Sequence, residues 1–245
     1  TGFGGMITVD GYSQFFKVLI SGALALAVLL SVRRVDTDHI QPAEYHALLL
    51  LASAGMMFAV SALDLLILYL GLELMTLCSY SLVGITVDKH RSNEAAIKYF
   101  LVASFASALL LYGIAVIYGL TGSTGFMAIA STLSGEGRLV SNPILLSGIG
   151  LLVAGLAFKI AAVPFHAWAP DAYQGASAPV AAFLASATKA AGLAAVGRVC
   201  LVALGPESLV LSLVVAGLAA LSIIVGSIII LAQDDMKRLL AYSSI

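Results

Sequence analysis

The segment FKIAAVPFHAWAP, residues 158–170, places a lysine and a proline inside one apolar run. The fifteen residues before Lys159 are all Gly, Ala, Ile, Leu, Val, Ser or Phe. Pro164 has no backbone N–H, so a helix that reaches it leaves a carbonyl one turn upstream without its usual donor. In lipid such a group must be satisfied by protein or by water. The segment therefore predicts a helix broken near Pro164 at membrane depth, beside a polar and hydrated pocket that holds Lys159.

The chain as a whole has the composition of a membrane protein. Of its 245 residues, 61% are hydrophobic and only 10% are charged, and its mean hydropathy is +1.06. Soluble domains are about 45–50% apolar and about 25% charged, so a water-soluble fold could not cover itself with so few charges. The composition therefore predicts an all-α polytopic membrane protein. The net charge of −1 gives no field that would favour nucleic acid.

The cysteines and histidines do not suggest a metal site or a disulfide scaffold. Cys78 and Cys200 each lie inside an apolar run, where a free thiol behaves as a small hydrophobic residue. The four histidines are far apart, and the sequence has no glycine-rich phosphate loop. We therefore expect neither a metal nor a cofactor bound to this chain.

Seven apolar segments are each long enough to cross about 30 Å of hydrocarbon, which takes about 20 residues. They are residues 12–32, 45–62, 64–85, 94–119, 143–163, 178–204 and 208–232, and an eighth segment begins near residue 237. Helix-start signals are Asp64, Asn93 with Glu94, Asn142 with Pro143, and Pro206 with Glu207 and Ser208. The chain starts without Met or a charged leader and ends where a helix begins, so we expect a fragment cut at both ends with no signal peptide.

Positive charge is concentrated in alternate loops. One set carries Arg33 with Arg34, Lys89 with Arg91, and Lys237 with Arg238, whereas the loops between them carry almost only Arg138. Six basic residues against one predict, by the positive-inside rule, that the first set faces the cytoplasm. This alternation requires residues 143–176 to cross the membrane once, so Pro164 must interrupt a single crossing.

Small residues recur along two of the segments. Gly148, Gly150 and Gly155 lie on one, and Gly192 and Gly197 on another. Small side chains let helix backbones approach closely where lipid supplies no hydrophobic drive. We expect close helix contacts at these five positions.

Four charged residues lie away from loops and helix ends: Glu73, Lys98, Lys159 and Lys189. Each would cost about 2.5–3.5 kcal/mol at a helix centre, so such charges persist when they pair or line a hydrated path. Glu73 lies nine residues into its helix, and its short stem cannot reach the surface. It is either half of a structural ion pair or a proton-path carboxylate.

Snorkelling to the surface is the alternative for the basic residues. Lys98 is about five residues inside its helix, whereas Lys189 is eleven residues inside and lies near the membrane centre. Arg198 is one to two turns from a helix end, which favours anchoring at the membrane interface. Burial and a nearby carboxylate act in opposite directions on the protonation of a lysine. Lys159, beside a helix break, is therefore predicted to load and release a proton.

Longer motifs resemble a known family. Residues 158–176, FKIAAVPFHAWAPDAYQGA, resemble the antiporter-like membrane-arm subunits of proton-pumping NADH:quinone oxidoreductase, respiratory complex I. The Gln–Gly ending and the following PVAAFLASATKAAG, residues 179–192, are most similar to the subunit N family within that group. Residues 69–84, 94–113 and 237–245 also resemble the family, so the similarity covers nearly the whole chain. One departure is GASAP at residues 175–179, where the family usually has Gly-Ala-Pro-Thr-Pro.

The resemblance implies a function and a set of site residues. It implies Glu73 as the carboxylate that pairs with a lysine, Lys159 as the broken-helix lysine, Lys189 as the central lysine and Lys98 as an accessory charge of the same proton path. It implies an inverted-repeat fold with residues 1–44 as a leading helix and loop, 45–204 as one complete five-helix repeat and 205–245 as the start of the second, all in one membrane domain, 1–245. It also implies a proton-translocating subunit with no redox centre, in a complex whose other subunits hold NADH, FMN, iron–sulfur clusters and quinone.

Several other functions remain open at this point. A subunit of a sodium/proton antiporter shares the Glu–Lys arrangement, and a subunit of a membrane-bound hydrogenase is a further alternative. A structural scaffold whose buried charges only lock helices together is the simplest alternative. The expected partners are lipid, protons and other membrane-arm subunits, and the expected location is the bacterial inner membrane, with the chain crossing it several times.

Overall fold

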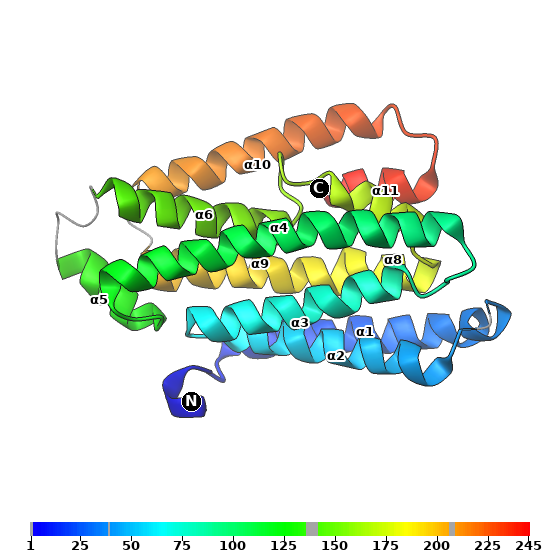
Figure 1. The fold of residues 1–245 in the computed structure, drawn as a ribbon, viewed down its shortest axis with the longest axis horizontal. Helices are drawn as coiled ribbons and strands as arrows, with labels where there is room; N and C mark the ends of the chain where they lie inside the picture. Colours follow the sequence, from blue (N-terminus) through cyan, green and yellow to red (C-terminus); the bar gives the residue numbers. More distant parts are fainter. Residues whose placement is uncertain (1, 39, 136–141, 206–208) are drawn as a thin grey trace.

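The computed structural model describes residues 2–38, 40–135, 142–205 and 209–245, and its regular elements are helical. The long helices lie roughly parallel in a bundle (Figure 1). In chain order the elements are η1 (Phe3–Gly5), α1 (Gly11–Thr37), α2 (Pro42–Ser61), α3 (Leu65–Val83), α4 (His90–Thr121), α5 (Phe126–Gly135), α6 (Pro143–Lys159), α7 (Trp168–Gly175), α8 (Ala178–Phe183), η2 (Leu184–Thr188), α9 (Lys189–Arg198), η3 (Val199–Ala203), α10 (Leu209–Ile230) and α11 (Met236–Ser244).

Six helices in the described part of the chain are long and apolar enough to cross a membrane. They cover Gly11–Arg33, Pro42–Ser61, Leu65–Val83, His90–Thr121, Ala178–Ala203 and Leu211–Ile230. The prediction of an all-α chain with several membrane-spanning helices is therefore confirmed, with six such helices in the described residues. The predicted segment 143–163 is different, because its helix α6 ends at Lys159 and has only 17 residues.

Two of the predicted helix starts agree with observed caps, whereas the start predicted at Asn93 and Glu94 is wrong because α4 begins at His90. Asp64 accepts a hydrogen bond from the Leu66 amide at the start of α3, and Asn142 accepts one from the Ile144 amide at the start of α6. The start signal predicted at residues 206–208 lies outside the described residues, as does Arg138.

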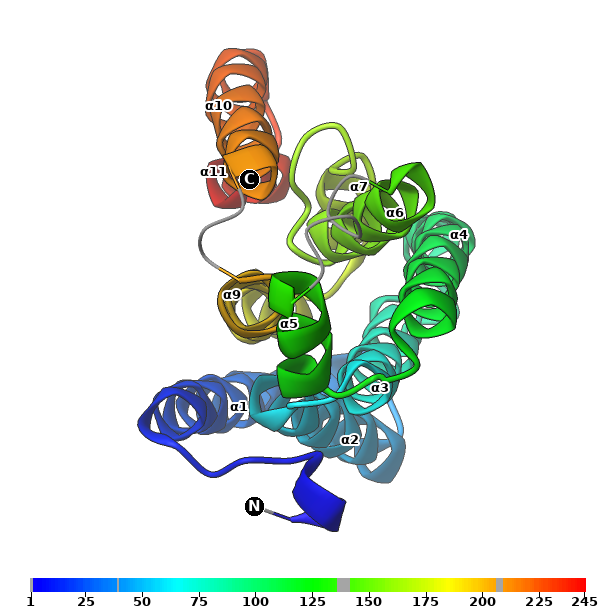
Figure 2. The same ribbon diagram turned by 90° about the vertical axis from the view of Figure 1, so that its left-hand side faces the viewer.

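Helix α5 was not predicted, because ten residues are too few to span a membrane. It lies across one end of the bundle (Figure 2).

Helix α6, the irregular segment after it and helix α7 together run antiparallel to α4. Figure 1 shows α6 beside α4, and contacts of individual residues give the direction of the two segments. In chain order, Gly148 faces Val116, Gly155 faces Leu110, Trp168 stacks on Tyr99, and Gly175 faces Arg91. The interrupted helix therefore follows the full length of one membrane-spanning neighbour.

The segment from α8 to η3 is one helix that contains two π-helical stretches, η2 and η3. Seen along the bundle, it lies inside an arc formed by α1, α2, α3, α4 and α6 (Figure 2). π-helical turns occur frequently at functional sites. Lys189 is the first residue after η2, and Arg198 is the last residue before η3.

The basic loops gather at one end of the bundle. The α1–α2, α3–α4 and α10–α11 connections lie together at the right-hand end of Figure 1. Lys89 also pairs with Asp38 at 2.9 Å and so joins two of these loops. The positive-inside prediction requires these three basic loops to lie on one side of the membrane, and their position at one end of the bundle agrees with it.

Glycines allow the close approach of α4 and α6. A Cβ atom built on Gly113 would lie 2.6 Å from the Leu152 nitrogen and 2.8 Å from the Gly148 carbonyl oxygen. Gly148 and Gly155 are similarly crowded, so those predicted contacts are confirmed. The prediction for Gly150 is wrong, because a Cβ there would meet no atom within 4 Å.

Gly113→Ala is expected to lower the free energy of unfolding by about 1–3 kcal/mol, because the new methyl group has only backbone to displace. The measurement is thermal unfolding of the detergent-solubilised protein. Gly150→Ala is the matched control, and it is expected to leave stability unchanged or to raise it by up to about 1 kcal/mol through helix propensity. Equal effects of the two substitutions would contradict close packing at Gly113.

Candidate functional site

Lys159 is the last residue of α6, and its ammonium is buried among polar groups of α3 and α4. The residue is 3% exposed. Its Nζ atom donates to Glu73 Oε1 at 2.9 Å, to Thr76 Oγ1 at 2.8 Å and to Ser107 Oγ at 3.3 Å. The three donors of the ammonium therefore all have acceptors, which is the condition for keeping a charge in a low-dielectric interior. Glu73 therefore pairs with a lysine, as the resemblance implied, and that lysine is Lys159.

Glu73 holds its carboxylate toward the same cluster from the middle of α3. Its side chain is 21% exposed, and it accepts a hydrogen bond from the Ser107 hydroxyl as well as from Lys159. Sequence reasoning missed Thr76 and Ser107. Thr76 could have been found, because it lies three residues after Glu73 and so on the same face of the helix.

The helix break follows Lys159 directly. Residues 160–167 leave the regular helix, Ala161 has a φ of +54°, and the Val163–Pro164 peptide bond is cis. A positive φ is uncommon for a residue with a Cβ and is held by its surroundings. The break predicted around Pro164 is therefore confirmed.

The polar backbone groups at the break are satisfied by side chains from other helices. The Phe158 carbonyl accepts from the Trp168 indole at 3.0 Å, and the Val163 amide donates to Ser222 Oγ at 2.9 Å. The Ile160 carbonyl, one turn before Pro164, accepts from Lys189 Nζ at 2.6 Å. This is the carbonyl that the sequence predicted to lose its helical donor.

Lys189 reaches the break from the central helix. It is buried at 7% exposure, and its Nζ atom lies 5.8 Å from the centre of the Trp168 ring. It also lines a cavity of about 350 Å³ between α6, α9, α10 and α11. Most of the cavity lining is apolar, and Ser222 and Ser244 add hydroxyl groups. A cavity therefore lies beside the break, but it is mostly apolar and is lined by Lys189 and not by Lys159, so it differs from the polar pocket around Lys159 that was predicted.

The two buried lysines face different sides of the break. Lys159 points toward α3 and α4, whereas Lys189 points toward Ile160 and the cavity. Among the described residues, no hydrogen bond joins Lys189 to Lys159 or to Glu73, the carboxylate partner of Lys159. A shared polar path between them stays a prediction.

Lys98 does not join this cluster. The prediction that it lies away from the surface is wrong, because its side chain is 52% exposed. It pairs with Glu94 at 2.7 Å and with Asp171 at 3.5 Å. The predicted depth of about five residues is also wrong, because α4 begins at His90 and Lys98 is its ninth residue. Depth along a helix does not tell which way a side chain faces.

The prediction that Arg198 anchors the chain at the membrane interface is also wrong. It is 5% exposed, and it binds Asp10 Oδ1 at 2.7 Å and the Val60 carbonyl at 3.0 Å. Its guanidinium lies 5.0 Å from the ring centre of Tyr12. It therefore ties the start of α1 and the end of α2 to the central helix.

The Asp10–Arg198 pair predicts an acid-dependent part of stability. The hydrogen bond from Arg198 holds the pKa of the Asp10 carboxyl well below its usual range. A carboxyl whose pKa is lowered on folding stabilises the fold above its unfolded pKa of about 3.9, and this contribution is lost as the pH falls below that value. We expect the melting temperature to drop less between pH 7 and pH 3 in Asp10→Asn than in the unaltered protein. Identical drops would contradict the pair's contribution.

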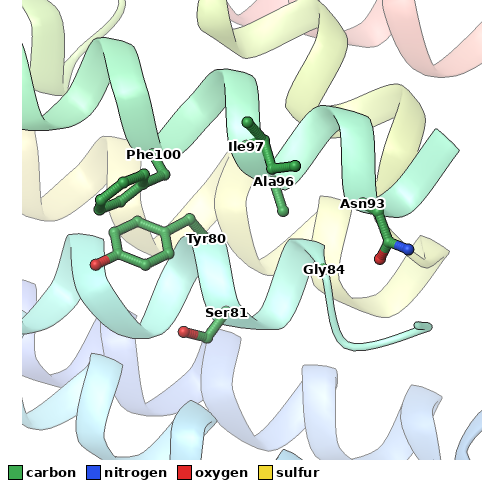
Figure 3. A pocket seen from close by; sticks show the side chains of 7 residues that line it. All are labelled: Tyr80, Ser81, Gly84, Asn93, Ala96, Ile97 and Phe100. Carbon is green, nitrogen blue, oxygen red and sulfur yellow. The ribbon is translucent and has the colours of Figure 1, made fainter. Parts of the chain in front are cut away.

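A separate groove lies between the end of α3 and the start of α4 (Figure 3). It has a volume of about 490 Å³, and none of the buried charged residues lines it. Its lining residues are Tyr80, Ser81, Gly84, Asn93, Ala96, Ile97 and Phe100. The described part of the chain contains no group of three or more His, Cys, Asp or Glu side chains that could hold a metal ion.

Comparisons with known proteins identify the family. Residues 62–245 match the family model described as NADH:quinone oxidoreductase/Mrp antiporter, TM. The chain is 46% identical to NADH-quinone oxidoreductase subunit N of Desulfovibrio desulfuricans, covering 100% of this chain and 49% of that protein. It is also 46% identical to NADH-quinone oxidoreductase subunit N 2 of Rhizobium meliloti, covering 99% and 50%. The chain thus spans about half the length of these relatives.

Solved structures show the same relationship at the level of the fold. A chain in respiratory complex I from Thermus thermophilus with bound aureothin is 40% identical and has a TM-score of 0.80, covering 100% of this chain and 50% of that one. A chain in the Mrp complex from Dietzia is 26% identical with a TM-score of 0.76, covering 97% and 43%. Identity is therefore higher to complex I proteins than to this antiporter. The protein belongs to the NADH:quinone oxidoreductase/Mrp antiporter membrane family, in which it resembles subunit N of NADH-quinone oxidoreductase over its whole length.

Proposed function

We propose that this chain is part of a proton-translocating membrane subunit of NADH:quinone oxidoreductase. In this proposal protons move along Glu73, Lys159 and Lys189, and quinone reduction in other subunits drives the movement. The chain itself holds no redox centre, and its partners are other membrane-arm subunits of the complex. The observation that carries the proposal is the buried Glu73–Lys159 ion pair at a broken membrane helix.

The ion pair supports a mechanism of proton loading and release. A lysine ammonium in a low-dielectric interior is stabilised by a touching carboxylate, and separating the two favours release of the proton. The break gives Lys159 a place where such a movement need not disturb a continuous helix. Lys189, which holds the freed Ile160 carbonyl, is the next basic group beyond the break and would receive the proton. Lys98 would act as an accessory charge at the surface end of the path.

The same proposal includes an arrangement in the membrane. Helices α6 and α7 would together make one crossing beside α4, which brings the total to seven crossings, with α11 starting an eighth. Residues 1–44 would lead into a first repeat at 45–204, and 205–245 would begin a second within one membrane domain. The basic loops would face the cytoplasm of a bacterial cell, with the protein in the inner membrane.

Glu73→Gln is expected to reduce NADH-driven proton pumping to the background level of inverted membrane vesicles, because an amide cannot exchange the proton or hold the lysine's charge. NADH oxidation is measured in parallel. Glu44→Gln, an exposed position near the start of α2, is the matched control and should pump normally. Normal pumping by Glu73→Gln would contradict the proposal.

A sodium/proton antiporter subunit is the second candidate, favoured by the likeness to the Mrp complex. The two functions differ in their dependence on sodium. We expect proton pumping in the same vesicles to be independent of sodium concentration. Proton flux that requires sodium and persists without NADH would favour the antiporter instead.

A further inference from the structure

The half-helix α7, which follows the break, is fixed by polar contacts to its neighbours α4 and α11. Asp171 Oδ1 accepts from Arg238 Nη1 of α11 at 2.7 Å, and Asp171 Oδ2 lies 3.5 Å from Lys98 Nζ of α4. Gln174 contacts α11 through Arg238 at 3.2 Å and through Asp235 at 2.9 Å. One carboxylate thus joins three helices.

The far end of α7 is held by the same neighbour. Lys237 Nζ donates to the Ala176 carbonyl at 2.6 Å and to the Gln174 carbonyl at 3.4 Å. A cation at this position complements the unpaired carbonyls and the dipole at a helix C-terminus. An isolated helix of eight residues is marginal, so contacts with its neighbours hold α7 in place, and these polar contacts add to the packing of its buried apolar face.

Trp168 lies one turn before Asp171 on α7 and contacts both sides of the break. It is 3% exposed and stacks on Tyr99 with a centroid distance of 4.4 Å and an interplanar angle of 6°. Its indole bonds the carbonyl of Phe158, the neighbour of Lys159, and its ring lies beneath the Lys189 ammonium. The position of α7 therefore sets the position of a side chain that bonds the backbone next to Lys159 and lies 5.8 Å from the Lys189 ammonium.

We propose that Asp171 is a positioning residue: held between Lys98 and Arg238, it fixes α7 so that Trp168 lies against both buried lysine segments. Asp171 touches neither Lys159 nor Lys189 and acts through Trp168. The consequence for transport rests on the proposed function, whereas the consequence for α7 does not.

The first test measures hydrogen–deuterium exchange of the purified complete complex by mass spectrometry. In Asp171→Asn, amides of residues 160–177 are expected to exchange about tenfold faster, with the other spans unchanged. Asp88→Asn, an exposed aspartate in the α3–α4 loop, is the matched control, and Asp171→Glu should restore protection. Unchanged exchange at residues 160–177 in Asp171→Asn, or faster exchange in all spans, would overturn the proposal.

The second test is a double-mutant cycle on proton pumping. Trp168→Phe removes the indole donor and keeps an aromatic ring, and we expect its pumping defect to match that of Asp171→Asn. The double variant should be no worse than Trp168→Phe alone, because residues that act through one another are not additive. Additive losses would overturn the inference that Asp171 acts through Trp168.

The two tests separate this inference from the proposed function. Faster exchange confined to residues 160–177, with normal pumping in every variant including Glu73→Gln, would leave the positioning of α7 standing and refute proton transport. Loss of pumping in Glu73→Gln with unchanged exchange in Asp171→Asn would support the function and refute the role of Asp171.

Discussion

Replacing Glu73 by Ala is expected to lower the free energy of unfolding by about 3–5 kcal/mol, the usual cost of breaking a buried ion pair by removing one partner. The Lys159 side chain is 2% exposed, so its ammonium would keep only the hydroxyls of Thr76 and Ser107 as neutral acceptors. The effect is large because the buried ammonium would lose its carboxylate partner. The measurement is thermal unfolding and yield of the assembled complex in detergent.

The double variant Glu73→Ala with Lys159→Met is the control for this prediction. It removes both charges, and well-packed apolar replacements of a buried pair are often neutral or stabilising. We expect the double variant to recover most of the stability lost in Glu73→Ala. A double variant as unstable as the single one would mean that the loss comes from the cavity at position 73 and not from the unpaired lysine.

Replacing Lys159 alone by Met is expected to abolish proton pumping while the complex still assembles. Met keeps most of the apolar stem, and Glu73 retains the Ser107 hydroxyl and a side chain that is 21% exposed. We therefore expect the protein to tolerate loss of the lysine better than loss of the glutamate. NADH-driven acidification of inverted vesicles gives the measurement, with subunit content checked by immunoblot.

Lys17→Met is the matched control for the loss of a membrane lysine. Lys17 lies in the membrane-spanning part of α1, away from the helix break in sequence and on a different element. We expect it to leave pumping and assembly unchanged. Equal loss of pumping from both substitutions would mean that any lysine removed from these helices is harmful, and Lys159 would have no special role.

The broken helix and its ion pair could be predicted from the sequence because both follow from costs that membranes impose. A proline inside an apolar run must free a carbonyl, and a glutamate too short to reach the surface needs a partner. Those two rules predicted the break near Pro164 and identified Lys159 and Glu73 as charges that need partners, and the family resemblance implied that Glu73 pairs with a lysine. The second lysine at the break, Lys189, followed from its position near the centre of its helix.

Contacts that depend on direction or on distant partners could not be predicted. Lys98 was assigned to the interior by its depth along a helix, but it faces outward toward Glu94. Arg198 pairs with Asp10, 188 residues away, and no local pattern connects the two. The π-helical turns before Lys189 and after Arg198 also leave no recognisable mark in an alanine-rich sequence.

The most direct test of proton transfer by Lys159 is the pumping of Lys159→Arg beside that of Lys159→Met. Arginine can pair with Glu73, but it cannot release a proton near neutral pH. The measurement is proton pumping coupled to NADH oxidation in inverted vesicles, in complexes shown to contain the subunit. If Lys159 carries protons, Arg should fail nearly as completely as Met. Full pumping with Arg and none with Met would contradict this account and leave Lys159 as the structural partner of Glu73.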